Sequence, residues 1–416
     1  MVHKPDQRSG RPRVTLWLGW DHDLYHISTL LTGLVELERT GRIYLHLAAS
    51  RAGKDQNTGV RLDVAWEGGG QIDRLAVDLR DDSRSWDAGL LADCDLYLKR
   101  SFRAASYTAL PIAQRNKFVP YGLNYSTRTS RMTARLLFHY LKQLPSYPAS
   151  LARFHKHITK QLVFSPTPEF YEAAPDSAVE RGVFFQTRVC NKESVPPSQD
   201  WQTFNESRAG LVRALRNELG PAFAGGLVPD ATARQYFPDL LTTAPTRRGE
   251  FIAYSRRFLV AVSSEGLHGS VGFKMAEALA AARCIVTEPL GSELTAPLVE
   301  EKNILTYQTV DDAVSHCVRL LEDHNLAARQ RANNHAYYRE FVEPAAHAWY
   351  TITAGTRKPV EVAEPVAMGG GLANLASGVG PASTGATILH QPPKQQQAAS
   401  AATTTTTTTT AAGRRP

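Results

Sequence analysis

Short apolar runs alternate with longer stretches of helical periodicity along most of this chain. The run Val14–Leu18 (VTLWL) predicts a buried strand, and Leu24–Arg39 carries apolar residues at helical spacing. Gly41 marks the end of that helix, and Arg42–Ala48 predicts the next strand. Strand, helix, strand is the opening of a Rossmann-like α/β domain. The GxGxxG pattern is missing, so the pattern does not favour a dinucleotide site.

The first half continues with more short strands. They are predicted at 62–66, 72–79, 95–99 and 117–120, and a helix follows at 128–144. Gly68-Gly69-Gly70 precede no helix, so they predict a turn rather than a phosphate-binding loop. The proline-rich stretch 145–174 predicts a crossing between domains, with a further helix in LARFHKHITKQLVF.

The second half restarts with a strand and keeps the alternation. Strands are predicted at 182–189, 222–228 and 303–306, and helices at 204–219, 249–257, 310–321 and 326–341. Asn205 is a candidate N-cap of the first of these helices.

The stretch Ser263–Pro289 is the most informative part of the chain. The apolar run 258–262 leads into a turn with three glycines, then a helix over 273–282 and a strand at 284–286. Glycines let the backbone approach a ligand closely, and an open helix start favours an anion such as a diphosphate. Lys274 and Glu277 share one helix face, where they suit phosphate and sugar hydroxyls. The alternative is an ordinary turn and helix with both charges solvated.

This stretch also resembles a known family. The run GFKMAEALAAARCIVTEPL, followed by LVEEKNILTYQTVDDAVSHCVRLLED, resembles the C-terminal half of nucleotide-sugar glycosyltransferases of the GT-B fold. A closer likeness, over 13–350, is to a bacterial group with a GLHGS–G–K–E signature, related to spore-maturation-type glycosyltransferase-like proteins. The resemblance implies an α/β fold of two Rossmann-like domains that face each other across a cleft.

Particular residues follow from the resemblance. Glu277, in AEALA, matches the glutamate that binds the ribose of the donor. Retaining members usually have a second glutamate eight residues earlier, where this chain has Gly269, so the stereochemistry of the reaction stays open. The resemblance also implies that a closing C-terminal helix, around His347–Tyr350, returns to the first domain.

These patterns together predict four regions. We expect a disordered basic N-terminus at 1–12, an acceptor domain at 13–165, a donor domain at 166–355 and a disordered tail at 356–416. The tail is dominated by Gly, Ala, Ser, Gln and a run of eight Thr, which supply too little apolar surface for a core.

Charge and cysteine content narrow the function. The net charge is +7, but 1–13 hold four basic residues against one acidic, and 356–416 hold five against two. The remaining body is therefore nearly neutral, which argues against a nucleic-acid binder. The cysteines are scattered, with no CxxC pair, and the N-terminus lacks an apolar h-region. We expect a cytoplasmic protein with no transmembrane segment and at most peripheral membrane contact.

Candidate donor-binding residues lie in and near the Gly-rich turn. In the resemblance, His268, Gly269 and Ser270 face the donor diphosphate and sugar, although Ser270 can instead cap the helix. Lys274 can neutralise a diphosphate, or it can be a solvated helix lysine. Arg188, near a strand end, can stabilise the leaving diphosphate or form a surface ion pair with Glu206 or Glu193.

Glycosyl transfer to a hydroxyl also needs a base. Asp21, His22 and His26 follow the first strand, and GT-B inverting enzymes often take the base from this loop. His22 is the candidate base, oriented by Asp21 or Asp23, and Asp21 can equally be the base itself. The alternative is a capping aspartate beside surface histidines.

The sequence thus predicts a glycosyltransferase that moves a sugar from a nucleotide-activated donor to an acceptor hydroxyl, in surface glycan or polysaccharide synthesis. No cofactor and no metal are expected, because Lys, Arg and a helix start supply the positive charge. The alternative is a non-catalytic GT-B-like protein that binds a sugar nucleotide or glycan, and a sugar-nucleotide epimerase shares the fold.

Overall fold

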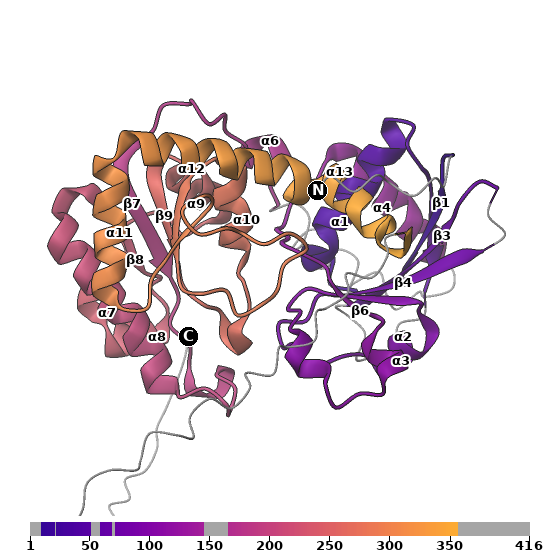
Figure 1. The fold of residues 1–416 in the computed structure, drawn as a ribbon, viewed down its shortest axis with the longest axis horizontal. Helices are drawn as coiled ribbons and strands as arrows, with labels where there is room; N and C mark the ends of the chain where they lie inside the picture. The colour runs from indigo at the N-terminus through magenta and orange to yellow at the C-terminus, as the bar shows by residue number, and fades with distance from the viewer. Residues whose placement is uncertain (1–9, 21, 51–58, 69–70, 145–164, 357–416) are drawn as a thin grey trace, which may run out of the picture. The chain divides into compact units, whose positions relative to one another are not determined.

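The computed structural model describes residues 10–20, 22–50, 59–68, 71–144 and 165–356. These residues belong to one compact unit, Met1–Pro359, and build two separate sheets with helices around them (Figure 1). The α/β fold class is therefore confirmed. The helix expected within 151–164 and the tail beyond residue 356 lie outside the described residues, and the domain boundary near residue 165 stays a prediction.

The first sheet has six strands in the order β2-β1-β3-β4-β5-β6. Strand β3 is antiparallel to both of its neighbours, whereas the other pairs are parallel. The β3–β4 connection is too short for a crossover helix, so these strands pair as a hairpin. This departs from a purely parallel Rossmann sheet. The strands are β1 Arg13–Leu18, β2 Tyr44–Ala49, β3 Gly59–Ala65, β4 Ile72–Asp78, β5 Leu96–Lys99 and β6 Phe118–Pro120.

Two long helices cover this sheet. Helix α1 (Leu24–Arg39) is capped by the Asp23 side chain, which accepts from the Tyr25 and His26 N–H groups. Helix α4 (Ser130–Gln143) is capped by Thr129. Both helices bury leucines and other apolar residues in the same core as the strands. The short helices α2 (Ala88–Asp93) and α3 (Ile112–Arg115) were not predicted.

The second sheet is parallel throughout, in the order β11-β10-β9-β7-β8. From β7 the chain adds β8 on one side and then β9, β10 and β11 on the other. The order thus reverses between β7 and β9, and such a switch point is where open α/β sheets bind ligands, beyond the carboxyl ends of the strands. The strands are β7 Glu180–Thr187, β8 Phe223–Leu227, β9 Phe258–Ser263, β10 Cys284–Thr287 and β11 Leu305–Thr306.

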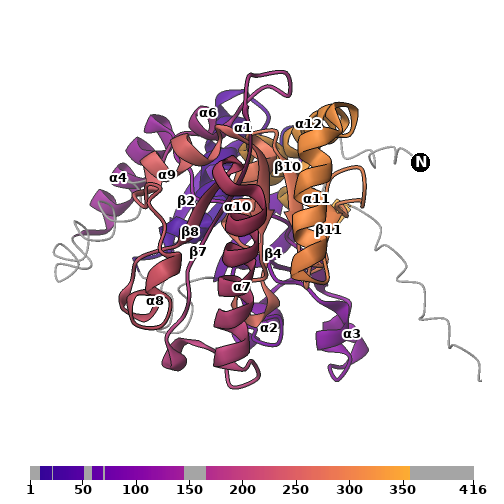
Figure 2. The same ribbon diagram turned by 90° about the vertical axis from the view of Figure 1, so that its left-hand side faces the viewer.

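Helices pack on both faces of the second sheet (Figures 1 and 2). One core joins the sheet to α7 (Trp201–Leu219) and α11 (Val310–Glu322), and the other joins it to α9 (Arg248–Ser255) and α10 (Phe273–Ala280). The predicted N-cap of α7 was wrong, because the helix starts earlier and Asp200 caps it. The smaller helices are α6 Pro168–Tyr171 and α8 Ala231–Tyr236.

The chain ends its described part on the first sheet. Helix α12 (His324–Tyr337) passes through a π-helical segment, Tyr338–Val342, into α13 (Pro344–Ile352). Helix α13 packs along α1 (Figure 1) and buries Ala348 and Ile352 in the core of the first sheet. The expected return of the C-terminal helix to the first half is therefore confirmed.

Gly33 makes the approach of these two helices possible. A Cβ atom at Gly33 would lie 1.8 Å from the carbonyl oxygen of Pro344. We expect Gly33→Ala to lower the free energy of unfolding by about 1–3 kcal/mol, because α13 must shift. Gly210→Ala, in α7, is the matched control, since its Cβ would meet nothing within 4 Å. Urea unfolding should show the control at or slightly above wild-type stability, and equal stability of both variants would contradict the close contact.

Candidate functional site

The Gly-rich turn lies at the switch point, where Thr187 ends β7 and Ser263 ends β9. His268 and Gly269 have φ angles of 59° and 70°, so the turn doubles back before α10 begins. Gly272 is the N-cap of α10, and no described side chain caps that helix. The prediction that Ser270 caps it was therefore wrong. The first N–H groups of α10 remain available to a ligand.

Arg208 connects β7 to this turn. Its guanidinium is buried and donates to the carbonyl oxygens of Arg188 at 2.5 Å and Glu265 at 2.7 Å. Arg188 itself is exposed and forms no ion pair with a carboxylate of the described residues. Of its two candidate partners, Glu206 instead lies 3.7 Å from Arg213. The ends of both strands are thus positively charged.

Lys274 adds a third positive charge. It stands in the first turn of α10 and donates to the carbonyl oxygen of Gln186 in β7. The protein crowded around its ammonium lowers the pKa to about 8, Glu277 opposes this shift, and Arg208 and Arg188 add to it. The side chain as a whole still contacts solvent. An anionic ligand would relieve this repulsion.

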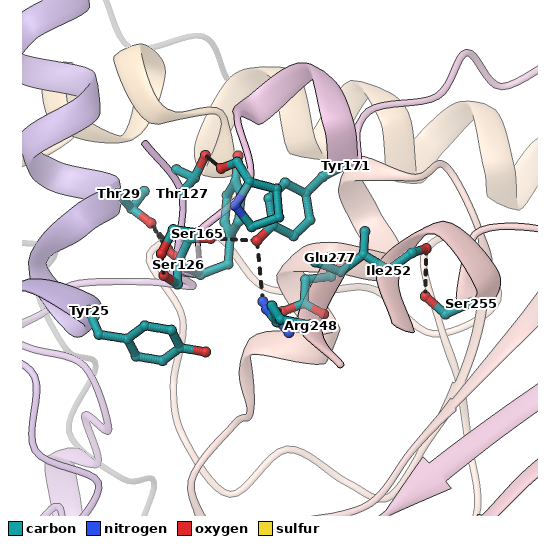
Figure 3. Close-up of polar contacts among 12 residues, drawn as sticks. Tyr25, Thr29, Ser126, Thr127, Ser165, Tyr171, Arg248, Ile252, Ser255 and Glu277 are labelled. Carbon is teal, nitrogen blue, oxygen red and sulfur yellow. Dashed lines mark hydrogen bonds and ion pairs between the residues drawn. The ribbon is translucent and has the colours of Figure 1, made fainter. Parts of the chain in front are cut away.

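Glu277 is buried and forms an ion pair with Arg248 (Figure 3). Arg248 also donates to the Tyr171 hydroxyl at 3.3 Å. Burial alone would lower the pKa of Arg248, but the Glu277 carboxylate outweighs it, and the pKa lies above its ordinary value. The pair fixes the direction of the carboxylate. Sequence reasoning missed Arg248, which starts α9 far from Glu277 in the chain and belongs to no local motif.

Residues at the start of α1 lie against the start of α10. The rings of Tyr25 and His26 each have centroids 5.4 Å from that of Phe273. The Tyr25 hydroxyl points toward Arg248 and Glu277 (Figure 3). The first half therefore supplies side chains to the edge of the candidate site.

His26 forms a dyad with Asp23. His26 Nδ1 lies 2.8 Å from Asp23 Oδ2. Burial raises the pKa of Asp23, but the hydrogen bonds and charge of His26 outweigh it, so the pKa lies below its ordinary value. A carboxylate on Nδ1–H leaves Nε2 of the neutral ring as a proton acceptor. This is the arrangement of a general base.

The structure places the other candidate histidine differently. His22 is buried, with Nδ1 2.9 Å from the Gly19 nitrogen and 3.2 Å from the Gly19 oxygen, within its own turn. Asp21 lies outside the described residues. The role of His22 as the base stays a prediction, but the geometry favours His26, because His26 contacts the start of α10.

The Gly-rich turn is also contacted by arginines of the first half. Arg103 Nη2 donates to the Gly269 carbonyl oxygen at 3.0 Å, and Arg100 Nη2 donates to that of Val271 at 3.0 Å. A Cβ at Gly269 would lie 1.8 Å from Arg103 Nη2, so this position has no room for a glutamate in this structure. His268 Nδ1 lies 3.6 Å from Asp82 Oδ2. His268 and Gly269 thus contact the first half, and the donor role of His268, Gly269 and Ser270 stays a prediction.

A cavity of about 40 Å³ lies beneath α10, lined by Lys274 and Glu277 among others. Small-molecule sites usually enclose roughly 300–1,000 Å³. A nucleotide sugar would therefore lie over the carboxyl edge of the sheet rather than inside this cavity. Among the described residues, no group of His, Cys, Asp or Glu side chains is arranged to hold a metal ion.

Known proteins resemble this chain only in structure. No family model and no curated protein matches it. An α1,3-fucosyltransferase is 10% identical, with a TM-score of 0.37 over 85% of this chain and 93% of that one. Anabaena HepE in complex with UDP-glucose is 11% identical, with a TM-score of 0.38 over 81% of this chain and 95% of that one.

A UDP-GlcNAc 2-epimerase from Neisseria meningitidis, bound to UDP-GlcNAc, is 12% identical, with a TM-score of 0.33. The match covers 64% of this chain and 62% of that chain. At these identities and TM-scores, the comparisons carry no conclusion about the activity of this chain. No helix in the described part of the chain is long and apolar enough to cross a membrane.

The Arg248–Glu277 pair can be tested by a double-mutant cycle. Arg248→Met leaves the buried Glu277 carboxylate unpaired and should lower the free energy of unfolding by about 3 kcal/mol. Adding Glu277→Leu should restore most of the loss, because no buried charge then remains. Arg213→Met, which removes the exposed partner of Glu206, should change stability by less than about 1 kcal/mol. Chemical denaturation measures all three, and a loss in Arg248→Met no larger than in the control would show that Glu277 is not held by this pair.

Proposed function

We propose that this chain is a glycosyltransferase that moves a sugar from a nucleotide-activated donor to an acceptor hydroxyl. The observation that carries the proposal is the cluster of Arg188, Arg208 and Lys274 at the switch point of the parallel sheet, beside the uncapped start of α10. Glu277 is paired with Arg248, and Glu265 lies 3.5 Å from Arg103, so the Glu288 carboxylate near Arg208 does not balance all three cations. A diphosphate supplies the missing negative charge.

The leaving group gains negative charge as the bond between the anomeric carbon and the diphosphate oxygen breaks. Fixed cations at that place lower the barrier, because they are positioned before the charge develops. Arg188 and Lys274 are the cations in reach of an open edge of the sheet, and Arg208 holds the turn in place. Glu277, oriented by Arg248, would accept hydrogen bonds from the ribose hydroxyls.

The acceptor hydroxyl must lose its proton as its oxygen bonds to the anomeric carbon. In the proposed reaction the proton passes to Nε2 of His26, and Asp23 stabilises the imidazolium that results. The contact of His26 with Phe273 supports this role, because it brings the dyad to the start of the phosphate-binding helix. Membership in the bacterial group with the GLHGS–G–K–E signature, and a hydroxyl of a surface glycan as acceptor, follow from the resemblance and belong to the proposal.

A second function has an observation in its favour. The Glu277 carboxylate is engaged by Arg248, and arginines from the first half hold the carbonyl groups of the Gly-rich turn. A protein that binds a sugar nucleotide or glycan without transferring it would show the same contacts. Binding and turnover therefore have to be measured separately.

Donor binding is tested by a thermal-shift screen of the full chain against nucleoside diphosphates and their sugars. One nucleotide should raise the melting temperature by a few degrees at about 100 times its Kd. Lys274→Met and Arg188→Met should each weaken binding by about tenfold or more, because each removes a cation from the phosphates. Lys302→Met, an exposed lysine elsewhere on the second half, is the control. The donor site is wrong if no nucleotide shifts the wild type, or if Lys302→Met weakens binding as much as the other two.

The base is tested by transfer assays with the donor that the screen identifies. His26→Gln should slow transfer by roughly 10²–10⁴-fold, because the acceptor proton then has no base. The affinity for the nucleoside diphosphate should be unchanged, since His26 does not contact the cation cluster. Gln in place of His22, assayed per folded molecule, should keep most of the activity. Loss of transfer in the His22 variant alone would assign the base to His22, and nucleotide binding without transfer by the wild type would favour the non-catalytic function.

A further inference from the structure

Arg283 is a buried arginine with no partner for its charge. It stands between α10 and β10, and 3% of its surface is exposed. Its Nε and Nη1 atoms are buried without hydrogen-bond partners, and no ion pair of its guanidinium exists among the described residues. A buried charge normally has a partner, because water cannot stabilise it there. An anionic ligand would therefore supply the partner that the Arg283 guanidinium lacks.

The surroundings of Arg283 raise the free energy of keeping its positive charge buried without a partner. Burial, together with the positive charges of Arg331 and Arg256, lowers the pKa of Arg283. An arginine keeps its proton in proteins nonetheless, so the charge stays. Arg331 donates to the carbonyl oxygens of Ala282 and Ser177, and Arg256 to those of Phe170 and Glu172.

Glu172, whose backbone carbonyl accepts from Arg256, has a carboxylate that is already engaged. Glu172 Oε1 accepts from the Tyr338 hydroxyl at 2.8 Å and lies 3.8 Å from Arg339. Backbone carbonyls satisfy N–H groups but carry no net charge. The Asp176 carboxylate acts on Arg331, but neither Arg283 nor Arg256 forms an ion pair with a carboxylate among the described residues.

This cluster of three arginines opens into the cavity beneath α10. Arg283 and Arg256 line that cavity, together with Ser255 and Ala281. Arg256 precedes β9 and Arg283 precedes β10, so both lie at the amino ends of the strands, whereas Lys274 lies at the carboxyl end. A volume of about 40 Å³ has room for a few water molecules or one small oxyanion. Lys274 and Glu277 also line this cavity, so the arginines lie toward the amino ends of the strands in a cavity that two of the proposed donor residues share.

We propose that Arg283 and Arg256 bind a phosphate group in this cavity. Phosphate fits better than a carboxylate, because it carries about two negative charges at neutral pH against a cluster of three arginines. The planar guanidinium of Arg283 can donate its unused Nε–H and Nη1–H to two phosphate oxygens. The phosphate is either free or the end of a small phosphorylated metabolite. Met275 and Ala278 of α10 also line the cavity, so an occupant would support the helix that carries Lys274 and Glu277.

The test is thermal unfolding of the full chain in inorganic phosphate at constant ionic strength. The melting temperature of the wild type should rise steadily with the logarithm of the phosphate concentration. Arg283→Met should abolish this rise. Without phosphate, Arg283→Met should melt at or above the wild-type temperature, because methionine fills the space and removes an unpaired buried charge. Arg283→Lys keeps the charge without the planar donor pair and should show a weaker rise.

The controls separate this site from the donor site and from general salt effects. Arg257→Met, an exposed neighbour paired with Glu180, should keep the full response. Arg283→Met should keep any response to nucleoside diphosphates. No phosphate response in the wild type, or a response that survives in both Arg283 variants, would overturn the proposal. Glycerol 3-phosphate at equal concentration identifies the source: a larger shift assigns a phosphorylated metabolite, and an equal or smaller one assigns free phosphate.

Discussion

The second half of this protein depends on one buried cation that has only backbone partners. Arg208 ties the end of β7 to the loop that follows β9, across the point where the strand order reverses. Its two carbonyl partners fix the path of the Gly-rich turn and so fix where α10 begins. The Glu288 carboxylate acts on Arg208 from nearby, but both groups that accept its hydrogen bonds are uncharged carbonyls. The same interaction thus shapes the loop and keeps the edge of the sheet attractive to anions.

The two ends of α10 present related electrostatic situations. At its start, Lys274 shares the switch point with Arg188 and Arg208, and after its end Arg283 lies among Arg256 and Arg331. Between them, Glu277 is matched one to one by Arg248. The helix therefore carries one balanced pair, Arg248 and Glu277, between two groups of positive charges.

The sequence predicted the elements well where the signal was local. The helix Leu24–Arg39 and the strands on either side of the Gly-rich turn lie within a residue or two of their predicted places. A strand was predicted at 62–66, where β3 lies, but its antiparallel direction was not, because alternation of apolar and polar residues does not reveal strand direction. Asp200, rather than Asn205, caps α7, since the polar residues before that helix offered several candidates.

The sequence predicted only those residues of the candidate site that lie close together in the chain. Lys274 and Glu277 were found because they share a helix next to glycines. Arg248, Arg103 and the contact of His26 with Phe273 could not be found, since each pairs residues far apart in the chain. Such pairings depend on how the halves of the chain meet, and no spacing within a single segment encodes that.

The return of α13 to the first sheet has a consequence for how the protein is made. Ala348 and Ile352 belong to the same core as Leu30 and Leu34 of α1, yet a ribosome adds them more than 300 residues later. Translation adds about 5–20 residues per second, so α13 is synthesised many seconds after the strands of the first sheet. During that time one side of α1 is uncovered apolar surface, which a chaperone would recognise. The core of the first half therefore cannot be complete until α13 has been synthesised.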